Sequence, residues 1–236
     1  MSLSRSTIID GCLEVIERDG ANALSLRKLG KHLGVDATAI YRHFSDKDDL
    51  LRGIGDRLHE SILIDLPTRG SWRNIVKEIC VRLRQAHLQR PDLAAFVRSG
   101  PPLHEQEFLL TETLLRHLAR ARLPPKDAAL AYHGLIELTV ASAAIDAPMA
   151  SRTPQERHDI YARWRGIYAS LDAQQYPASV AHAPHLYATT ADDRFEFALE
   201  RLLDGLEGLR QSEPGVSRQL TKPGRSRRRT NQDRPL

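Results

Sequence analysis

The chain has 236 residues, of which 41% are hydrophobic, so it is long enough for one small and one larger domain, each with a packed core. Its formal net charge of +4 is concentrated at one end: residues 217–236 hold seven Lys and Arg and one Asp, which leaves the rest at −2. The overall charge therefore does not by itself indicate a nucleic-acid partner. No stretch has the apolar length of a membrane span or of a signal-peptide core, and Cys12 and Cys80 are expected to be buried free thiols of a cytoplasmic protein.

The first part of the chain predicts a group of short helices. Residues 4–19 form an amphipathic helix, and residues 24–44, LSLRKLGKHLGVDATAIYRHF, form two shorter helices joined by a tight turn. Ser25 stands at the N-cap of the first short helix, and Gly34 follows its last leucine, where a left-handed C-cap favours glycine. Asp36 is expected to cap the second short helix.

The second short helix has a polar face that suits contact with DNA. Ile40 and Phe44 are four residues apart and are expected to point inward. The outward residues are then Thr38, Tyr41, Arg42 and His43. Residues 25–47 also carry a local charge of +3, which favours phosphate binding. An ordinary helical hairpin with a polar solvent face is the alternative.

The remainder predicts a longer helical domain, because helix formers dominate and no alternating run of Val, Ile and Thr suggests a strand. The expected helices span 47–64, 71–89, 92–97, 105–122, 126–147, 154–171 and 192–210, the last capped by Asp192, with a loop at 172–190. The helix at 126–147 is apolar almost all round, which is typical of a bundle core or a subunit interface. Residues 212–236 have almost no apolar side chains and are expected to be a disordered basic tail.

These elements resemble the TetR family of bacterial transcriptional regulators. The matching runs are SLRKLGKHLGV, ATAIYRHF and SDKDDLL, and, more loosely, QRPDLA, LLRHLARARLPPKDAALAYHGLIELTVAS and DRFEFALERLLDGLE. The resemblance implies an all-α fold with an N-terminal three-helix helix-turn-helix DNA-binding domain at 1–46. A C-terminal helical bundle for ligand binding and dimerisation follows at 47–211. The implied function is a repressor that binds double-stranded operator DNA as a homodimer and is released by a small organic effector.

Carried over residue by residue, the resemblance implies a set of DNA contacts. They are Ser25, Arg27, Ala37, Thr38, Ala39, Tyr41, Arg42, His43 and Lys47. Arg42 is the best candidate for direct base reading, since a guanidinium can pair with a guanine edge, and the two alanines could touch a thymine methyl. For Arg42 and Thr38 a solvated face is the alternative. Residues 1–6 are expected to be a frayed arm, from which Arg5 could reach a phosphate.

The resemblance also implies that helices 126–147 and 192–210 pair with their twins in a four-helix dimer interface. The expected interface residues are Leu135, Leu138, Phe195, Leu199, Leu202, Leu203 and Leu206. A short recognition helix contacts only a few base pairs, so a DNA-binding protein of this size is expected to act with a second copy of itself. Burial of the leucine stripe in the core of a single chain is the alternative.

An effector site is expected among the helices at 47–64, 71–89, 105–122 and 126–147. Its lining residues would be Leu58, Ile62, Ile79, Leu83, His87, His104, Phe108, Leu114, His117, His133, Glu137 and Leu138, with Arg98 as a further polar candidate. An apolar cavity with few polar anchors suits a small, mostly hydrophobic molecule better than a sugar or a nucleotide. Tetracycline fits poorly, because Leu63, Ile79 and Leu83 align with polar drug-binding positions of the tetracycline repressor.

Signals for an enzyme are weak. His104 and Glu105 match the first two residues of the zinc-protease motif HExxH, but Phe108 occupies the position of its second histidine. No glycine-rich phosphate loop or nucleophile elbow is present, so no catalytic residue, metal, cofactor or membrane partner is expected. A helical enzyme or structural protein with an incidental hairpin is the alternative function.

Overall fold

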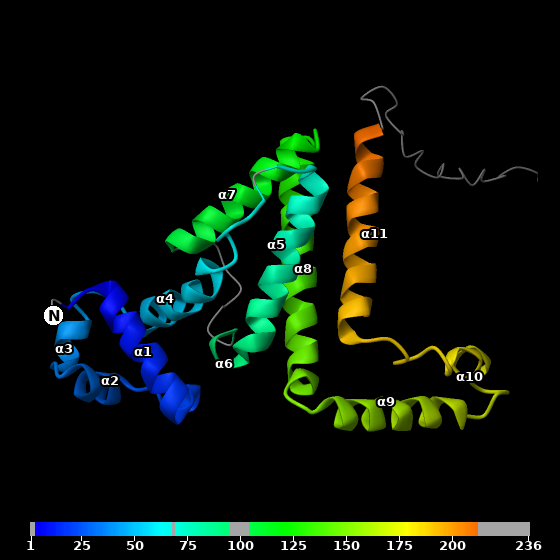
Figure 1. Cartoon of the computed structure of the whole chain (residues 1–236), viewed down its shortest axis with the longest axis horizontal. Coiled ribbons are helices and arrows are strands. Elements are labelled where there is room, and N and C mark those ends of the chain that lie inside the picture. The colour runs from blue at the N-terminus through cyan, green and yellow to red at the C-terminus, as the bar shows by residue number, and fades with distance from the viewer. Residues whose placement is uncertain (1–2, 68, 95–103, 212–236) are drawn as a thin grey trace, which may run out of the picture.

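The computed structural model describes residues 3–67, 69–94 and 104–211, and within these ranges it is helical without strands, as predicted. The helices are α1 (Arg5–Asp19), the short 3-10 helix η1 (Ala21–Ala23), α2 (Leu26–Leu33), α3 (Ala37–Ile40), α4 (Lys47–Glu60), α5 (Trp72–Gln89), α6 (Pro91–Ala94), α7 (Glu105–Arg120), α8 (Pro125–Ala150), α9 (Pro154–Ala169), α10 (Pro177–His182) and α11 (Ala191–Gln211). Figure 1 shows a small unit of α1, α2 and α3 that α4 joins to a bundle of longer helices.

The N-terminal unit has its own apolar core. Its buried members are Ile8, Cys12, Ile16, Leu29, Ile40, Phe44, Leu50, Ile54 and Leu58. The last three belong to α4, so this helix contributes to the core of the N-terminal unit while it also packs against α5, α6 and α7. Cys12 and Cys80 are buried free thiols, as predicted.

The hairpin in this unit has the predicted caps. The Ser25 hydroxyl accepts a hydrogen bond from the Lys28 amide at 3.2 Å, and the Asp36 carboxylate accepts one from the Thr38 amide at 2.7 Å. Gly34 has φ of +68°, the left-handed conformation that ends α2. The turn is so tight that a Cβ on Gly30 would lie 2.8 Å from the Val35 carbonyl oxygen. These local contacts fix the angle between α2 and α3.

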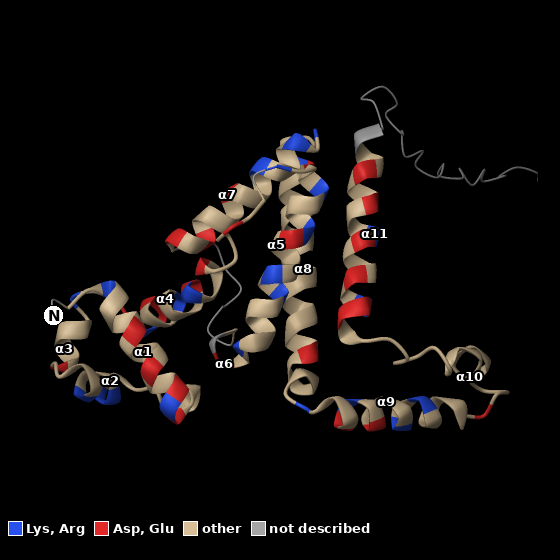
Figure 2. Ribbon diagram, viewed as in Figure 1, with Lys and Arg blue, Asp and Glu red and all other residues tan. Residues whose placement is uncertain are grey.

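The larger unit is a bundle of α5, α7, α8 and α11 around a second apolar core. Ion pairs close the edge between α5 and α11: Arg73 pairs with Glu200 and, at 2.8 Å, with Asp204, and Lys77 lies 2.9 Å from Glu200. Figure 2 shows the acidic residues that run along α11. Where α4 meets α7, the Asp56 carboxylate on α4 accepts hydrogen bonds from the backbone amides of Gln106 and Glu107, at 3.2 and 2.8 Å. The first turn of α7 is therefore fastened to the helix that carries the N-terminal unit.

Several expected boundaries differ from the structure. Helix α4 ends at Glu60 rather than 64, α8 extends to Ala150, and the expected loop at 172–190 contains α10. The cap of α11 is Thr190, whose hydroxyl accepts a hydrogen bond from the Asp193 amide at 3.0 Å, because the helix begins at Ala191; Asp192 lies inside it and pairs with Arg84. Residues 95–97 of the expected helix at 92–97, Arg98 and the tail at 212–236 lie outside the described residues.

The expectation that no stretch reaches membrane-spanning length is wrong for α8. This helix of 26 residues is long and apolar enough to cross a membrane by length and composition. It packs against α5, α7 and α11 within the chain, and a core helix of a bundle passes the same test.

Candidate functional site

A polar, exposed surface forms where α3 and the following turn meet solvent. Ile40 and Phe44 are almost fully buried, which turns the intervening side chains outward. Tyr41 is 51% exposed, Thr38 and Arg42 are exposed, and His43 is half-buried. Ala37 and Ala39 lie half-buried beside them, where a short side chain lets a partner approach the helix closely. The structure thus brings the predicted reading residues together on one face.

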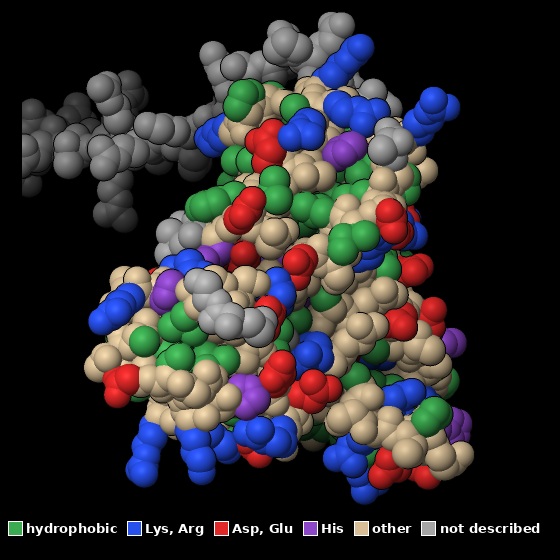
Figure 3. Space-filling view, turned by 60° about the vertical axis from the view of Figure 1, so that its left-hand side comes forward, with side chains coloured by type: hydrophobic (Ala, Val, Ile, Leu, Met, Phe, Trp, Pro, Cys, Tyr) green, Lys and Arg blue, Asp and Glu red, His purple; other side chains and the backbone are tan. Residues whose placement is uncertain are grey.

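Cations flank this face on α2. Figure 2 marks Lys and Arg residues along α2, and Figure 3 shows basic side chains projecting from this unit. Lys28 is held by Asp19 at 3.0 Å, whereas Arg27, Lys31 and Arg42 have no carboxylate partner in the part of the chain that the structure describes. Unpaired, exposed cations gathered beside a polar helix are what a phosphate backbone requires.

Two further predicted contacts share one hollow. Ser25, at the start of α2, and Lys47, at the start of α4, line a cavity of about 240 Å³ with Leu24, Leu50 and Ala21. The Ser25 hydroxyl accepts the capping hydrogen bond and keeps its own proton for a phosphate oxygen. The Asp46 carboxylate caps α4, accepting from the Asp49 amide at 2.7 Å.

Sequence reasoning misplaced Arg5. It is not on a frayed arm but opens α1, where Ser4 provides the N-cap. Its guanidinium donates to the His43 carbonyl oxygen at 2.7 Å and to Asp49 at 3.0 and 3.2 Å, and lies 4.2 Å from the centre of the Phe44 ring. Arg5 lowers the pKa of Asp49 by this pairing. It therefore ties the turn after α3 to α4; the cap at Ser4 indicates where α1 begins, but nothing in the local sequence indicates this contact.

The predicted effector residues separate into three groups by burial. Those at the junction of α4, α5 and α7 are buried: Leu58, Ile62, Ile79, Leu83, His87 and Leu114. His104, His117 and Leu138 are half-buried. Phe108 is 52% exposed, and His133 and Glu137 are exposed on α8, so within this chain these three face solvent rather than the interior. Helical spacing predicts which residues share a face of α7 or α8, but it does not predict which face packs against the rest of the bundle.

A pair of stacked histidines supplies polar groups in this interior. His59 on α4, which sequence reasoning missed, and His87 on α5 are 5% and 3% exposed, and their rings lie 6.3 Å apart at 16°. Burial lowers the pKa of His59 to about 4 and also lowers that of His87, so both rings are neutral at pH 7. Nδ1 of His59 and Nε2 of His87 have no hydrogen-bond partner among the described residues.

The expected dimer stripe is largely core of the single chain. Leu135, Phe195, Leu199, Leu203 and Leu206 are buried against their own bundle, which is the alternative that the sequence left open. Leu138 and Leu202 remain half-buried. The apolar side chains that α8 and α11 leave exposed are Leu130, Ile145, Phe197 and Leu209. The described residues contain no cluster of three or more His, Cys, Asp or Glu that could hold a metal ion.

Comparison with known proteins agrees with this geometry. Residues 8–54 match the model of "Bacterial regulatory proteins, tetR family", and residues 66–210 match that of "Tetracyclin repressor-like, C-terminal domain". The tetracycline repressor protein class G of Vibrio anguillarum is 30% identical over 88% of this chain and 95% of its own length. Apo ActR from Streptomyces coelicolor superposes with a TM-score of 0.77 at 27% identity, over 89% of this chain and 98% of ActR.

A second structure of ActR, in complex with actinorhodin, superposes with a TM-score of 0.76 at 28% identity, over 89% of this chain and 99% of ActR. The matched regions include both the surface around α3 and the helical bundle, and regulators of this type are not enzymes. The chain belongs to the TetR family of bacterial transcriptional regulators, which bind DNA through the helix-turn-helix unit.

Proposed function

We propose that this chain is a cytoplasmic repressor that binds a palindromic operator as a homodimer and leaves it when a small, mostly hydrophobic effector binds. The observation that carries this proposal is the exposed face of α3, where Thr38, Tyr41 and Arg42 stand beside unpaired cations on α2. Arg42 would read a base edge, and Ser25, Arg27, Tyr41, His43 and Lys47 would position the phosphates.

Dimerisation follows from the size of the reading element. Helix α3 spans only Ala37–Ile40, so one copy reads a few base pairs, whereas two copies read two half-sites. The exposed Ile145 on α8 and Phe197 on α11, at 75% and 68%, favour these helices as the interface, with Leu138 and Leu202 at its edge. Large exposed apolar side chains on neighbouring helices favour contact with a partner.

Coupling between effector and DNA would run through α4. Its N-terminal part packs in the core of the reading unit, and its Asp56 holds the first turn of α7, whose Leu114 faces the buried effector region. An effector that favoured a different spacing of α4 and α7 would move the two reading units relative to each other. Differential affinity for the two arrangements is what release requires.

The interior predicts the chemistry of the effector. Leucines and isoleucines dominate the region between α4, α5 and α7, and the neutral rings of His59 and His87 add polar nitrogen atoms to it. Such a region favours a planar or amphipathic hydrophobic molecule with a few hydrogen-bonding groups. The crystallised complex of ActR with actinorhodin and the relation to tetracycline repressors support this class.

The experiment is a gel shift with the promoter region beside the gene of this protein, followed by release with a panel of compounds. A specific shift that a hydrophobic aromatic compound reverses is the expected result. If no segment of that promoter shifted at low salt, or if only a sugar phosphate released the complex, the proposal would be wrong.

A further inference from the structure

A second cavity lies far from the reading face, at the C-terminal end of α8. It has a volume of about 540 Å³ and opens between α5, α8, α9 and the segment that leads into α11. Leu88, Met149, Tyr161, Arg165, Tyr187 and Thr189 are among its lining residues. Its volume falls in the range of small-molecule sites. None of the residues expected to bind the effector lines it.

One wall is aromatic. Tyr161 on α9 stacks on Tyr187 with the ring centres 5.8 Å apart at 21°, and Trp164 meets Tyr187 edge-on at 5.0 Å. Tyr187 has φ of +55°, a left-handed conformation that is rare for a residue other than glycine, and Arg165 donates to its carbonyl oxygen at 2.7 Å. A strained backbone held in place beside a cavity is a frequent mark of a binding site. The wall offers a flat surface on which a planar ring can stack.

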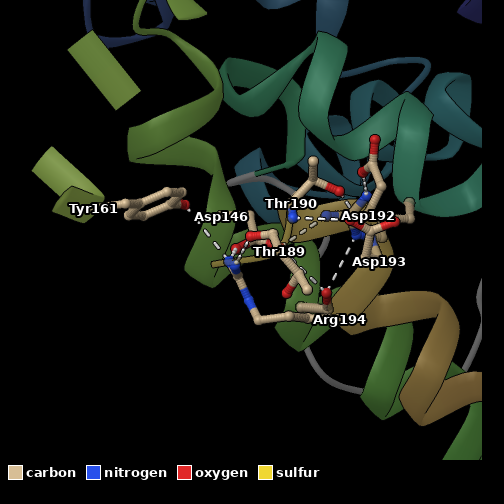
Figure 4. A network of polar contacts seen from close by, with 9 residues as sticks. Asp146, Tyr161, Thr189, Thr190, Asp192, Asp193 and Arg194 are labelled. Atoms are coloured by element: carbon tan, nitrogen blue, oxygen red, sulfur yellow. Dashed lines mark hydrogen bonds and ion pairs between the residues drawn. The ribbon is translucent and has the colours of Figure 1, made fainter. Parts of the chain in front are cut away.

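The floor of the cavity is a closed network of charges. Arg84 is 3% exposed and donates to Asp146 at 2.8 Å, to Ser142 at 3.2 Å and to Asp192. Figure 4 shows how Arg194 reaches from the start of α11 toward Asp146 and the Tyr161 hydroxyl, each at 3.5 Å. Two arginines thus face two carboxylates, and the network is balanced.

Two more arginines in the cavity have no such balance. Arg157, Tyr161 and Arg165 are spaced four residues apart, so they lie on one face of α9, and all three line the cavity. Arg157 donates to the Arg152 carbonyl oxygen at 2.7 Å, and Arg165 to that of Tyr187. Neither guanidinium pairs with a carboxylate within residues 3–67, 69–94 and 104–211. The charged side chains that line the cavity, Arg84, Arg157 and Arg165 against Asp146 and Asp192, therefore leave an excess charge of +1 beside its aromatic wall.

We propose that this cavity binds an aromatic carboxylate, whose ring stacks against the wall formed by Tyr161 and Tyr187 and whose carboxylate pairs with Arg157 and Arg165. A guanidinium presents several donors in one plane, so each arginine can keep its carbonyl contact and still donate to the ligand. The aromatic wall favours an aromatic anion over inorganic phosphate or a sugar phosphate. The site does not depend on DNA, so its test is independent of the proposed repressor function.

The test is calorimetric titration of the full chain, without DNA, with 2-naphthoate and with the uncharged 2-naphthamide. We expect one naphthoate per chain and binding of the amide that is weaker by about tenfold or more, because charge-assisted hydrogen bonds are lost. Replacing both arginines, Arg157→Gln with Arg165→Gln, is expected to remove the preference for naphthoate. Arg157→Gln alone keeps the contact of Arg165 with Tyr187 and is expected to weaken naphthoate in a chain with unchanged melting temperature.

Arg163→Gln is the matched control, because Arg163 lies exposed on the same helix and does not line the cavity. It is expected to bind naphthoate like the unmodified chain. Three outcomes would overturn the proposal: no naphthoate binding by the unmodified chain, equal binding of acid and amide, or equal losses in Arg157→Gln and Arg163→Gln. A change of oligomeric mass in Arg157→Gln would also overturn it, since this arginine would then face a second copy of the chain.

Discussion

Replacing Arg5 tests whether the reading segment is held from α1. Arg5→Ala removes the hydrogen bond to the His43 carbonyl oxygen, the pair with Asp49 and the contact with the Phe44 ring. The Arg5 side chain is 44% exposed, so the ion pair is worth at most about 1 kcal/mol, and the ring contact adds about 0.5–1 kcal/mol. The hydrogen bond to the His43 carbonyl oxygen adds about 1 kcal/mol. Together the three contacts limit the effect to about 3 kcal/mol, or roughly 150-fold in operator affinity, if all of it serves to position the helix.

The assay is fluorescence anisotropy of labelled operator at several salt concentrations. A positioning role predicts weaker binding with an unchanged slope of log affinity against log salt, whereas a direct phosphate contact would lower the slope by about 0.9. Arg18→Ala is the control, since Arg18 also pairs on the surface of α1, with Asp19, but away from the reading segment. Operator affinity like that of the unmodified chain, or an equal loss in Arg18→Ala, would refute the reasoning.

The other predictions concern DNA contacts, pH and the tail. Arg42→Ala is expected to relax base preference at one position and cost about 1–3 kcal/mol there, whereas Lys47→Ala is expected to weaken all sequences alike and flatten the salt slope; operator variants in the same assay distinguish the two. Because burial lowers the pKa of His59 to about 4, the unfolded chain binds the extra proton between pH 6.5 and 4. The free energy of unfolding is therefore expected to fall by about 3 kcal/mol as the pH drops through that window, and by less in His59→Phe. Urea titrations at each pH measure this change, and a free energy of unfolding that did not change with pH would contradict the prediction. Deleting residues 212–236 is expected to leave the melting temperature unchanged, and a large drop would show that they pack.

The hairpin could be predicted because its signals are local. The caps at Ser25 and Asp36 and the left-handed Gly34 depend on neighbours within three residues, and all three stand as expected. The same holds for the inward Ile40 and Phe44. The reading face followed from these elements without any knowledge of tertiary contacts.

Features that depend on long-range packing could not be predicted. The contact between Arg5 and Asp49 spans 44 residues, and nothing in either local sequence indicates it. The leucine stripe of α11 showed that one face is buried, but periodicity does not say whether its own bundle or a partner covers it. Phe108 was placed inside because it lies within an amphipathic helix, yet the packed face of α7 is that of Leu110, Leu114 and Leu118.

The cavity beside α9 was missed for a related reason. Arg157, Tyr161 and Arg165 looked like the solvent face of an ordinary helix, because the residues that oppose them, such as Arg84 and Tyr187, come from distant parts of the chain. Similarly, His59 carried no signal of its burial until α4 and α5 were placed side by side.

A DNase I footprint on the promoter beside the gene of this protein tests the central claim most directly. We expect protection of one palindromic region, with half-sites separated by about one helical turn of DNA or a multiple of it, and loss of that protection in Arg42→Ala at the same protein concentration. Protection without symmetry, or an unchanged footprint in Arg42→Ala, would contradict the assignment of α3 as the element that reads DNA.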